Sequence, residues 1–390
     1  MGKLQDIRAV ARRELRIIRQ RPIYFFGTIV PLVLSAIFYL TLFHEGTPES
    51  LPVGVVDLDH SSYFSRELGK ELGDNQLCKV KNYKTFPNAR IDMQRGKIAG
   101  FVVIPDGAYK NIMSFKRPTF SFYINGLYFI GGSLAYKELL TLANLGNGAV
   151  QREFLRAYGV NEDAIMGMIQ PIVVECHPIG NKEVNFNYYL SSILIPAVLS
   201  MIIIIVLIYS LGAELKYGTS RHLLRTSGGS ITIAILGKLY VYTIIFSIMG
   251  LGVIFLLYDW LHFPIAGSIW NMVLDMFLLV IASEAMAITF IGLFPVTRLA
   301  MSVGALYSIL AFSFSGFTLP VEQMPTLIQG LSAGFPIRHY YLFYVQEVLY
   351  GSGFAGWWQE IIHMLVFLCI PFLFGPRLKK AYIHLNFPRN

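Results

Sequence analysis

The stretch YFFGTIVPLVLSAIFYLTLF, Tyr24–Phe43, is an apolar run long enough to cross the ~30 Å hydrocarbon core of a lipid bilayer. A mostly polar segment, 44–187, follows it, and further apolar runs crowd into the C-terminal half. These runs are Tyr188–Ser210, Ile231–Leu257, Trp270–Phe294, Leu299–Leu319 and His363–Phe374. The last run is too short to cross unless it begins earlier, near Trp357. One early span and five late spans therefore frame one large loop domain.

The composition supports a membrane protein. Charged residues make up 14% of the 390-residue chain, whereas soluble domains carry about 25%. The net charge of +8 could suit a nucleic-acid partner, but much of the positive charge flanks the apolar runs. The basic residues before the first run are Lys3, Arg8, Arg12, Arg13, Arg16, Arg19 and Arg21, and those after the last run are Arg377, Lys379, Lys380 and Arg389. Basic residues stay on the cytoplasmic side. Both termini are therefore predicted to be cytoplasmic, which requires an even number of spans.

The predicted fold is a polytopic α-helical membrane protein with six transmembrane helices and an inserted extracytoplasmic α/β domain. Its parts are a cytoplasmic amphipathic interfacial helix at 1–22, a first transmembrane helix at 23–43, the α/β domain at 44–187, a five-helix transmembrane domain at 188–376 and a cytoplasmic tail at 377–390. Within the five-helix domain, 212–230 is predicted to be a cytoplasmic loop and 320–356 an extracytoplasmic re-entrant segment.

The N-terminal helix is predicted from its helical periodicity. One face carries Leu4, Ile7, Ala11, Leu15 and Ile18, and arginines gather elsewhere on the helix. Such a helix lies in the membrane interface with its arginines among lipid phosphates. The alternative is a basic N-terminus that only obeys the positive-inside rule.

The segment 44–187 alternates strand and helix patterns. Strands are predicted at Leu51–Asp59, Ile98–Pro105, Pro118–Asn125 and Ile172–Glu175. Helices are predicted after Ser61 or Ser62, at Pro87–Lys97, from Asp106 and over 127–158, with Gly159 as a stop. This succession favours an α/β unit with at least partly parallel pairing.

The sequence lacks the familiar catalytic and metal-binding motifs. Gly237-Lys238 has neither the upstream glycine nor the following Ser/Thr of a P-loop, and GxSxG, HExxH and EF-hand patterns are missing. His177, His222, His262 and His339 are scattered, and no CxxC is present. We therefore predict no catalytic, cofactor-binding or metal site, and no enzyme activity of the chain's own.

Two cysteines fall in the segment predicted to be extracytoplasmic. Cys78 and Cys176 would share an oxidising compartment there. The sequence leaves open whether they form a disulfide.

The loop AELKYGTSRHLL, Ala213–Leu224, is the most informative motif. A helix is expected to break at Gly218 and to restart with Thr219 or Ser220 as its N-cap. The short helix would present Leu223 and Leu224 beside charge, a shape suited to docking into a groove on a soluble partner. A plain connecting loop with one capped turn explains the same residues equally well.

The fourth and fifth runs carry further candidates. Asp275 and Glu284 are nine residues apart and therefore face opposite sides of a helix. Asp275 lies near the outer end and is expected to reach water. Glu284 lies near mid-membrane, where an ionisable group is costly and either functional or held by structural hydrogen bonds.

A stripe of small residues marks the fifth run. It consists of Gly304, Ser308, Ala311 and Ser315. Small faces let helices approach closely. Helix packing is the favoured interpretation, and a surface that lines a pathway or contacts a second membrane subunit is the alternative.

Several segments together resemble one family. The loop Glu214–Leu224 looks like the coupling helix of type-2 ATP-binding-cassette permeases, in which an acidic residue precedes Gly-Thr and a leucine-rich turn. Ser315–Pro325 is similar to the family's re-entry after the fifth span, and Pro336–Gly353 to the segment before the last span. Val55–Ser62 with Gly96–Pro105 resembles the subgroup that has a large domain between the first two spans. The resemblance covers nearly the whole chain.

The resemblance implies a membrane-spanning permease subunit of an exporter in the cytoplasmic (inner) membrane of a bacterium. ATP would be bound by separate ATPase subunits, which dock at the coupling loop through Glu214, Lys216, Gly218, Thr219, Arg221, Leu223 and Leu224. A second permease would complete a homo- or heterodimer. One departure is the basic Lys216 and Arg221, where relatives often carry more acid.

Two other function classes remain as alternatives. A self-sufficient secondary transporter would favour paired internal repeats and broken helices, which are not evident in the sequence. A membrane-anchored binding or scaffold protein would act through its external domain, and five further spans exceed what an anchor needs. No residue pattern selects a substrate.

Overall fold

The computed structural model describes residues 3–44, 46, 51–59, 78–114, 116–126, 129–174, 180–181 and 185–384. The chain divides into two units: Met1–Gly46 with His177–Asn390, here called the helical unit, and Thr47–Cys176, the sheet unit. The predicted helix after Ser61 or Ser62 lies outside the described residues.

A four-stranded sheet organises the described part of the sheet unit. Its order is β2-β1-β3-β4, with β1 parallel to both β2 and β3, and β4 antiparallel to β3. The strands are β1 Leu51–Asp57, β2 Cys78–Tyr83, β3 Gly100–Ile104 and β4 Ser121–Ile124. The predicted partly parallel α/β pairing is therefore confirmed.

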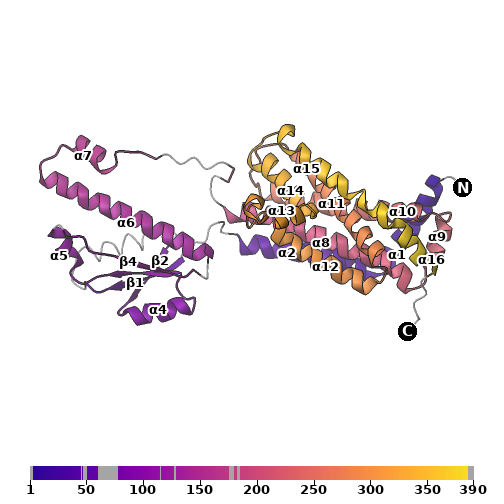
Figure 1. The fold of residues 1–390 in the computed structure, drawn as a ribbon, viewed down its shortest axis with the longest axis horizontal. Coiled ribbons are helices and arrows are strands. Elements are labelled where there is room, and N and C mark those ends of the chain that lie inside the picture. The colour runs from indigo at the N-terminus through magenta and orange to yellow at the C-terminus, as the bar shows by residue number, and fades with distance from the viewer. Residues whose placement is uncertain are drawn as a thin grey trace. The chain divides into compact units, whose positions relative to one another are not determined.

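Helices cover both faces of this sheet (Figure 1). Helix α6, Phe129–Ala157, packs over one face, where Val55 and Val102 are buried with Leu139. Helix α4, Phe86–Gln94, packs over the other, where Val56 and Phe101 are buried. Alternate residues of a strand point to opposite faces, so neighbouring apolar residues of β1 serve two separate cores. Shorter helices complete the unit: α5 Ala108–Met113 and α7 Glu162–Ile169.

Two strand predictions were wrong in this unit. Strand β2 was not expected, because its lysines, Lys79 and Lys81, interrupt the apolar pattern; the strand lies at the sheet edge, where lysines are typical. The predicted strand Ile172–Glu175 is not a strand over 172–174, and residue 175 lies outside the described residues. Val174 is 80% exposed, whereas the apolar residues of the sheet strands β1 and β3 are mostly buried.

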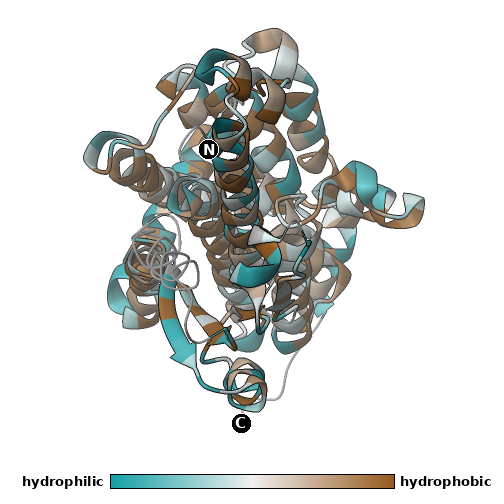
Figure 2. Ribbon diagram, turned by 90° about the vertical axis from the view of Figure 1, so that its left-hand side faces the viewer, coloured by the Kyte–Doolittle hydropathy of each residue, from teal (hydrophilic) through white to brown (hydrophobic). Residues whose placement is uncertain are grey.

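Six helices of the described chain are long and apolar enough to cross a membrane, as the sequence predicts. They are α2 Pro22–Leu42, α8 Phe186–Lys216, α10 Ile231–Ile254 with its π-helical extension Phe255–Trp260, α11 Ile269–Leu293, α12 Thr297–Phe314, and the pair α15 Phe354–Phe367 and α16 Ile370–His384. The hydropathy colouring of Figure 2 marks extended hydrophobic stretches along these helices.

Two predicted span limits need correction. The fifth span ends at Phe314 rather than Leu319, because Gly316 adopts a positive φ of 97° that a continuous helix excludes. The last begins at Phe354, so the expected earlier start near Trp357 is confirmed to within three residues, but the span extends past Phe374 to His384 and is interrupted between Phe367 and Ile370. The residues between them form short helices: the 3₁₀ turn Val321–Gln323, α13 Thr326–Ser332, α14 Pro336–Tyr344 and the π-helical turn Val345–Leu349.

Helix α8 forms the centre of the helical unit. It packs against α2, α11 and α12, and together with α11 it is mostly buried. The other spans expose large apolar side chains such as Phe26 on α2 and Ile248 on α10. Such faces are stable only against lipid or another apolar partner. The amide of Phe186 donates to the carbonyl of Gly46 at 2.8 Å, so the chain leaves and re-enters the helical unit at neighbouring points.

Helix α1, Lys3–Gln20, packs closely on α10. The helix itself is confirmed, but its packed face is centred on Val10, Ala11 and Glu14, whereas Leu4 is 73% exposed. A Cβ placed on Gly237 of α10 would lie 2.6 Å from Cβ of Val10 and 3.1 Å from the carbonyl oxygen of Ile7. The two helices therefore touch through a glycine.

We predict that Gly237→Ala loosens α1. The added methyl group overlaps the backbone side of α1, and overpacking of this kind destabilises by about 1–3 kcal/mol. Gly252→Ala on the same helix is the control, because a Cβ there meets nothing within 4 Å and alanine favours the helix by up to about 1 kcal/mol. Thermal unfolding and protease sensitivity of α1 in the purified protein measure the difference. Equal stability of the two variants would contradict the close packing.

Candidate functional site

Four charged side chains meet where α1 packs against α8 and α10. Arg13 and Glu14 come from α1, Glu214 from α8 and Lys238 from α10; they are here called the buried ion cluster. Glu14 and Lys238 are 0% and 1% exposed, and Glu214 is 3% exposed. Two carboxylates face two cations, so the cluster is formally neutral.

Lys238 lies at the centre of the cluster. Its Nζ lies 2.6 Å from Oε2 of Glu14 and 3.1 Å from Oε1 of Glu214. It also donates to Oγ of Ser210 at 3.0 Å. The hydroxyls of Ser210 and Tyr242 both donate to the second oxygen of Glu14, at 2.8 and 2.9 Å. All the polar atoms of Glu14 and Lys238 therefore have partners, as burial of charge requires.

Glu214 links the cluster to the loop that follows α8. Arg13 donates to both of its carboxylate oxygens, Nη1 to Oε1 at 2.7 Å and Nη2 to Oε2 at 2.9 Å. Such two-point guanidinium–carboxylate pairs fix orientation as well as distance. The hydroxyl of Thr219 donates to the same Oε2 at 2.5 Å. The acidic residue and the threonine of the motif are thus joined directly.

The loop motif folds as a helix–break–helix. Gly218 ends α8 with a φ of 68°, and α9 runs over Ser220–Thr226. Thr219 occupies the N-cap position, as predicted, but its side chain caps no backbone amide because it is bonded to Glu214. The expected helix break at Gly218 is confirmed, since α8 continues to Lys216 and ends just before this glycine.

The apolar pair of the motif does not face outwards. Leu223 is 0% and Leu224 7% exposed, and both belong to the core of the helical unit. The expectation that these leucines dock a partner is therefore wrong: they anchor α9 to the bundle. The surface of this loop consists instead of Lys216, Tyr217, Gly218, Arg221, His222 and Arg225.

Helix α9 is also fixed to the end of the last span. Oγ of Ser220 donates to the carbonyl of Tyr382 at 2.9 Å, and the guanidinium of Arg221 donates to the carbonyl of Ile383 at 3.2 and 3.3 Å. Helix α9 is therefore attached to α16 as well as to α8, which it follows in the chain.

The two carboxylates of α11 have different surroundings. Glu284 is 3% exposed, and its Oε2 accepts a hydrogen bond from Thr243 of α10 at 2.7 Å. Its other oxygen, Oε1, has no hydrogen-bond partner among the residues that the structure describes. Asp275 is 0% exposed, and neither of its oxygens has a hydrogen-bond partner within the described part of the chain. The expectation that Asp275 reaches water is wrong, because the packing of α11 encloses it.

The small-residue stripe of α12 faces α8. Gly304, Ser308, Ala311 and the following Ser315 are all buried. A Cβ on Gly304 would lie 2.7 Å from Cδ1 of Ile208 on α8, so the helices approach closely there.

For the predicted cysteine pair, Cys176 lies outside the described residues, and the disulfide stays a prediction.

Sequence reasoning missed Lys238 and Glu14. Lys238 is the one basic residue within the run Ile231–Leu257, and an ionisable residue inside a span implies a partner. Glu14 shares a helical face with Val10 and Ala11 at spacings of four and three. These positions were the available indication, but nothing in the sequence pairs Glu14 with a lysine 224 residues away.

We predict that Lys238→Met destabilises the protein by about 3–5 kcal/mol, the range for removing one partner from a buried pair. The variant leaves two buried carboxylates with one guanidinium. Adding Glu14→Gln restores neutrality, so the double variant should be more stable than the sum of the single changes indicates. Denaturant unfolding in detergent measures the cycle.

Lys216→Met is the matched control, since Lys216 is exposed at the end of α8. Its change in unfolding free energy should be small. If Lys238→Met and Lys216→Met unfold alike, the cluster does not stabilise the fold.

Comparison with known proteins agrees with this architecture. The family profile described as "ABC-2 family transporter protein" matches residues 21–375. The "Inner membrane transport permease YhhJ" proteins of Escherichia coli (strain K12) and Shigella flexneri are each 23% identical to this chain over 328 residues, covering 82% of it and 83% of their own length. Helix α1 precedes the matched range. With its family profile covering most of the sequence, the chain belongs to the ABC-2 transporter family, the type-2 permeases of ATP-binding-cassette transporters.

Proposed function

We propose that this chain is the membrane-spanning permease subunit of an ATP-binding-cassette exporter, powered by ATP hydrolysed on a separate subunit. Membership of the transporter family supports a transport subunit rather than an enzyme. The buried ion cluster is the observation that carries the proposal further. It connects the loop motif, through Glu214, to α1 and α10 in one neutral unit.

The proposed coupling follows the contacts in order. A partner that pushes α9 moves Leu223 in the core and the carbonyl contacts of α16. Thr219 and Glu214 pass the same movement to Arg13 and Lys238. Charged hydrogen bonds in a dry interior resist stretching more than surface pairs do, so loop and spans should shift together.

The proposed docking surface is the exposed basic face of the loop, not its leucines. Lys216, Arg221 and Arg225 are all exposed there. A surface of this charge suits an acidic groove on the ATPase subunit, since complementary charge guides association and selects partners.

The proposed topology places both termini and the loop 212–230 in the cytoplasm. The insert, 44–187, and the re-entrant segment, 320–356, would then face the other side. Basic residues at both ends of the chain and in the loop support this orientation. The relatives named as inner membrane permeases support a bacterial inner membrane. A dimer of permeases with two ATPase subunits completes the proposed complex. Neither a secondary transporter nor a scaffold is favoured by any contact among the described residues.

Affinity purification of the tagged full-length protein distinguishes these classes. An ATP-binding-cassette ATPase should co-purify with the permease. A secondary transporter or a scaffold would come without one, and that result would contradict the proposal.

We predict that Lys216→Glu combined with Arg225→Glu lowers the affinity for that ATPase at least about tenfold, equivalent to about 1.4 kcal/mol. The reversal places like charges across the proposed interface. It leaves the buried residues unchanged, so the spans should fold normally. Co-purification yield and ATPase stimulation are the measurements.

The control for this variant is Arg298→Glu combined with Lys379→Glu. It changes the net charge equally at exposed positions outside the loop. Normal ATPase binding by the loop variant, or equal loss in both variants, would reject the basic face as the docking surface.

We also predict that Glu284→Gln assembles with the ATPase and retains export. The amide keeps the contact with Thr243, whose hydroxyl then donates to an amide oxygen in place of a carboxylate oxygen. Transport into inverted vesicles, measured beside complex yield, tests this. A variant that assembles fully but does not transport would assign Glu284 to the pathway and overturn its structural role.

A further inference from the structure

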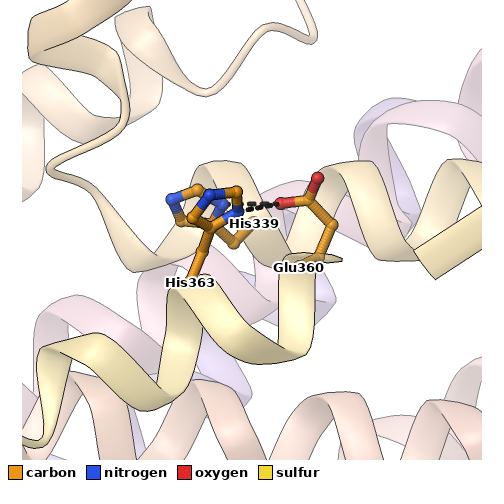
Figure 3. A group of neighbouring side chains, drawn as sticks. All are labelled: His339, Glu360 and His363. Atoms are coloured by element: carbon orange, nitrogen blue, oxygen red, sulfur yellow. Dashed lines mark hydrogen bonds and ion pairs between the residues drawn. The ribbon is translucent and has the colours of Figure 1, made fainter. Parts of the chain in front are cut away.

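Three side chains of the types that bind metal ions lie together at a place separate from the buried ion cluster. His339 lies on α14, and Glu360 and His363 lie three residues apart on one face of α15 (Figure 3). One ligand atom from each falls within 4.8 Å of the others. The sequence prediction that His339 stands apart from other ligand-type residues is corrected here, because helix packing supplies partners from α15.

The hydrogen bonds of His339 indicate which nitrogen of its imidazole ring carries a hydrogen. Nε2 lies 3.0 Å from the carbonyl oxygen of Ala333. A carbonyl only accepts, so Nε2 carries the hydrogen, and in a neutral imidazole Nδ1 then bears the lone pair. That Nδ1 faces Oε2 of Glu360 at 2.6 Å. A separation of 2.6 Å is a hydrogen-bond distance, so a proton lies between these two atoms in this structure. A metal ion that replaced the proton would need the two atoms further apart.

The second histidine favours the metal ion. Nδ1 of His363 lies 3.5 Å from the same Oε2 of Glu360, and the two imidazole rings lie 4.8 Å apart. With metal–ligand bonds of about 2.1 Å, two ligand atoms of a tetrahedral zinc site are about 3.4 Å apart. The His363–Glu360 separation matches this value. The His339–Glu360 separation would have to open by about 0.8 Å when the ion binds.

We propose that Nδ1 of His339, the carboxylate of Glu360 and Nδ1 of His363 bind one divalent transition-metal ion of the zinc class. Imidazole and carboxylate are ligands of such ions, and three protein ligands leave a position for water or another ligand. The bond from His339 to the Ala333 carbonyl is the outer contact that orients a ligating histidine. The side chain of His363 is 53% exposed, so an ion has access from the surface. The neighbouring Arg338 donates to the carbonyl of Gln329 on α13.

The bound ion would tie α14 to α15. Helix α14 belongs to the segment between the fifth span and the last, and α15 begins the last span, so the site would fix the re-entrant region to the final span. This role does not depend on which substrate the protein carries or on the identity of the ATPase.

The test uses the full-length protein purified in detergent, stripped with a chelator and titrated with Zn²⁺. Elemental analysis after gel filtration should give one zinc per chain. Titration with Co²⁺ should give the intense visible absorption of a four-coordinate site with nitrogen and oxygen ligands. Glu360→Gln and His363→Ala should each lower the affinity at least about tenfold, since even outer contacts of metal ligands contribute that much.

His384→Ala is the control, because His384 is an exposed histidine on α16; it should bind zinc as the wild type does. The exposure of His363 makes its substitution compatible with folding, which gel filtration checks. No zinc bound by the wild type, or equal affinity in Glu360→Gln, His363→Ala and the control, would overturn the proposal. The contact between His339 and Glu360 would then be an imidazolium–carboxylate ion pair.

Discussion

A lysine ammonium enclosed in a bundle of apolar helices must have carboxylates within hydrogen-bond distance, because burying an unpaired charge is far more costly than any packing gain. Lys238 meets this constraint with Glu14 and Glu214, from helices far apart in sequence. The pairing fixes the rotation of α1, since Arg13 must at the same time reach Glu214. An amphipathic helix that could otherwise float at the membrane surface is thereby held in one register on α10.

This pairing explains how the loop motif is attached to the membrane spans. The acidic residue of the motif is a member of the buried cluster, and the threonine after the glycine binds it directly. The leucines anchor α9 from inside, and its basic side chains are left for a partner. A short helix fixed at several points to three spans transmits displacement efficiently, whereas a helix attached through an exposed apolar pair would move independently of the bundle. The family match to residues 21–375 does not include α1, so the locking of α1 is inferred from this chain's own contacts.

The sequence predicts the features that depend on local patterns. Run length determines the six spans, helical periodicity identifies α1, and apolar blocks mark β1 and β3. Features that depend on which residue contacts which were missed or misjudged. The lysines Lys79 and Lys81 obscure the pattern of an edge strand, and Leu223 packs into the core rather than facing a partner protein. The carboxylate that pairs with Lys238 lies 224 residues away in the sequence. In each case the deciding contact comes from another element, and no spacing within the chain reports it.

The distance between α1 and α9 is the measurement that tests the account most directly. Spin labels at the exposed positions Arg16 and His222, in a chain whose cysteines have been replaced, report this distance by pulsed electron paramagnetic resonance. If the buried ion cluster locks the two helices together, the wild type should give one narrow distance that persists with ATPase and nucleotide bound, and Lys238→Met should broaden it. A narrow distribution that Lys238→Met leaves unchanged, or a wild-type distance that changes with nucleotide, would contradict the account.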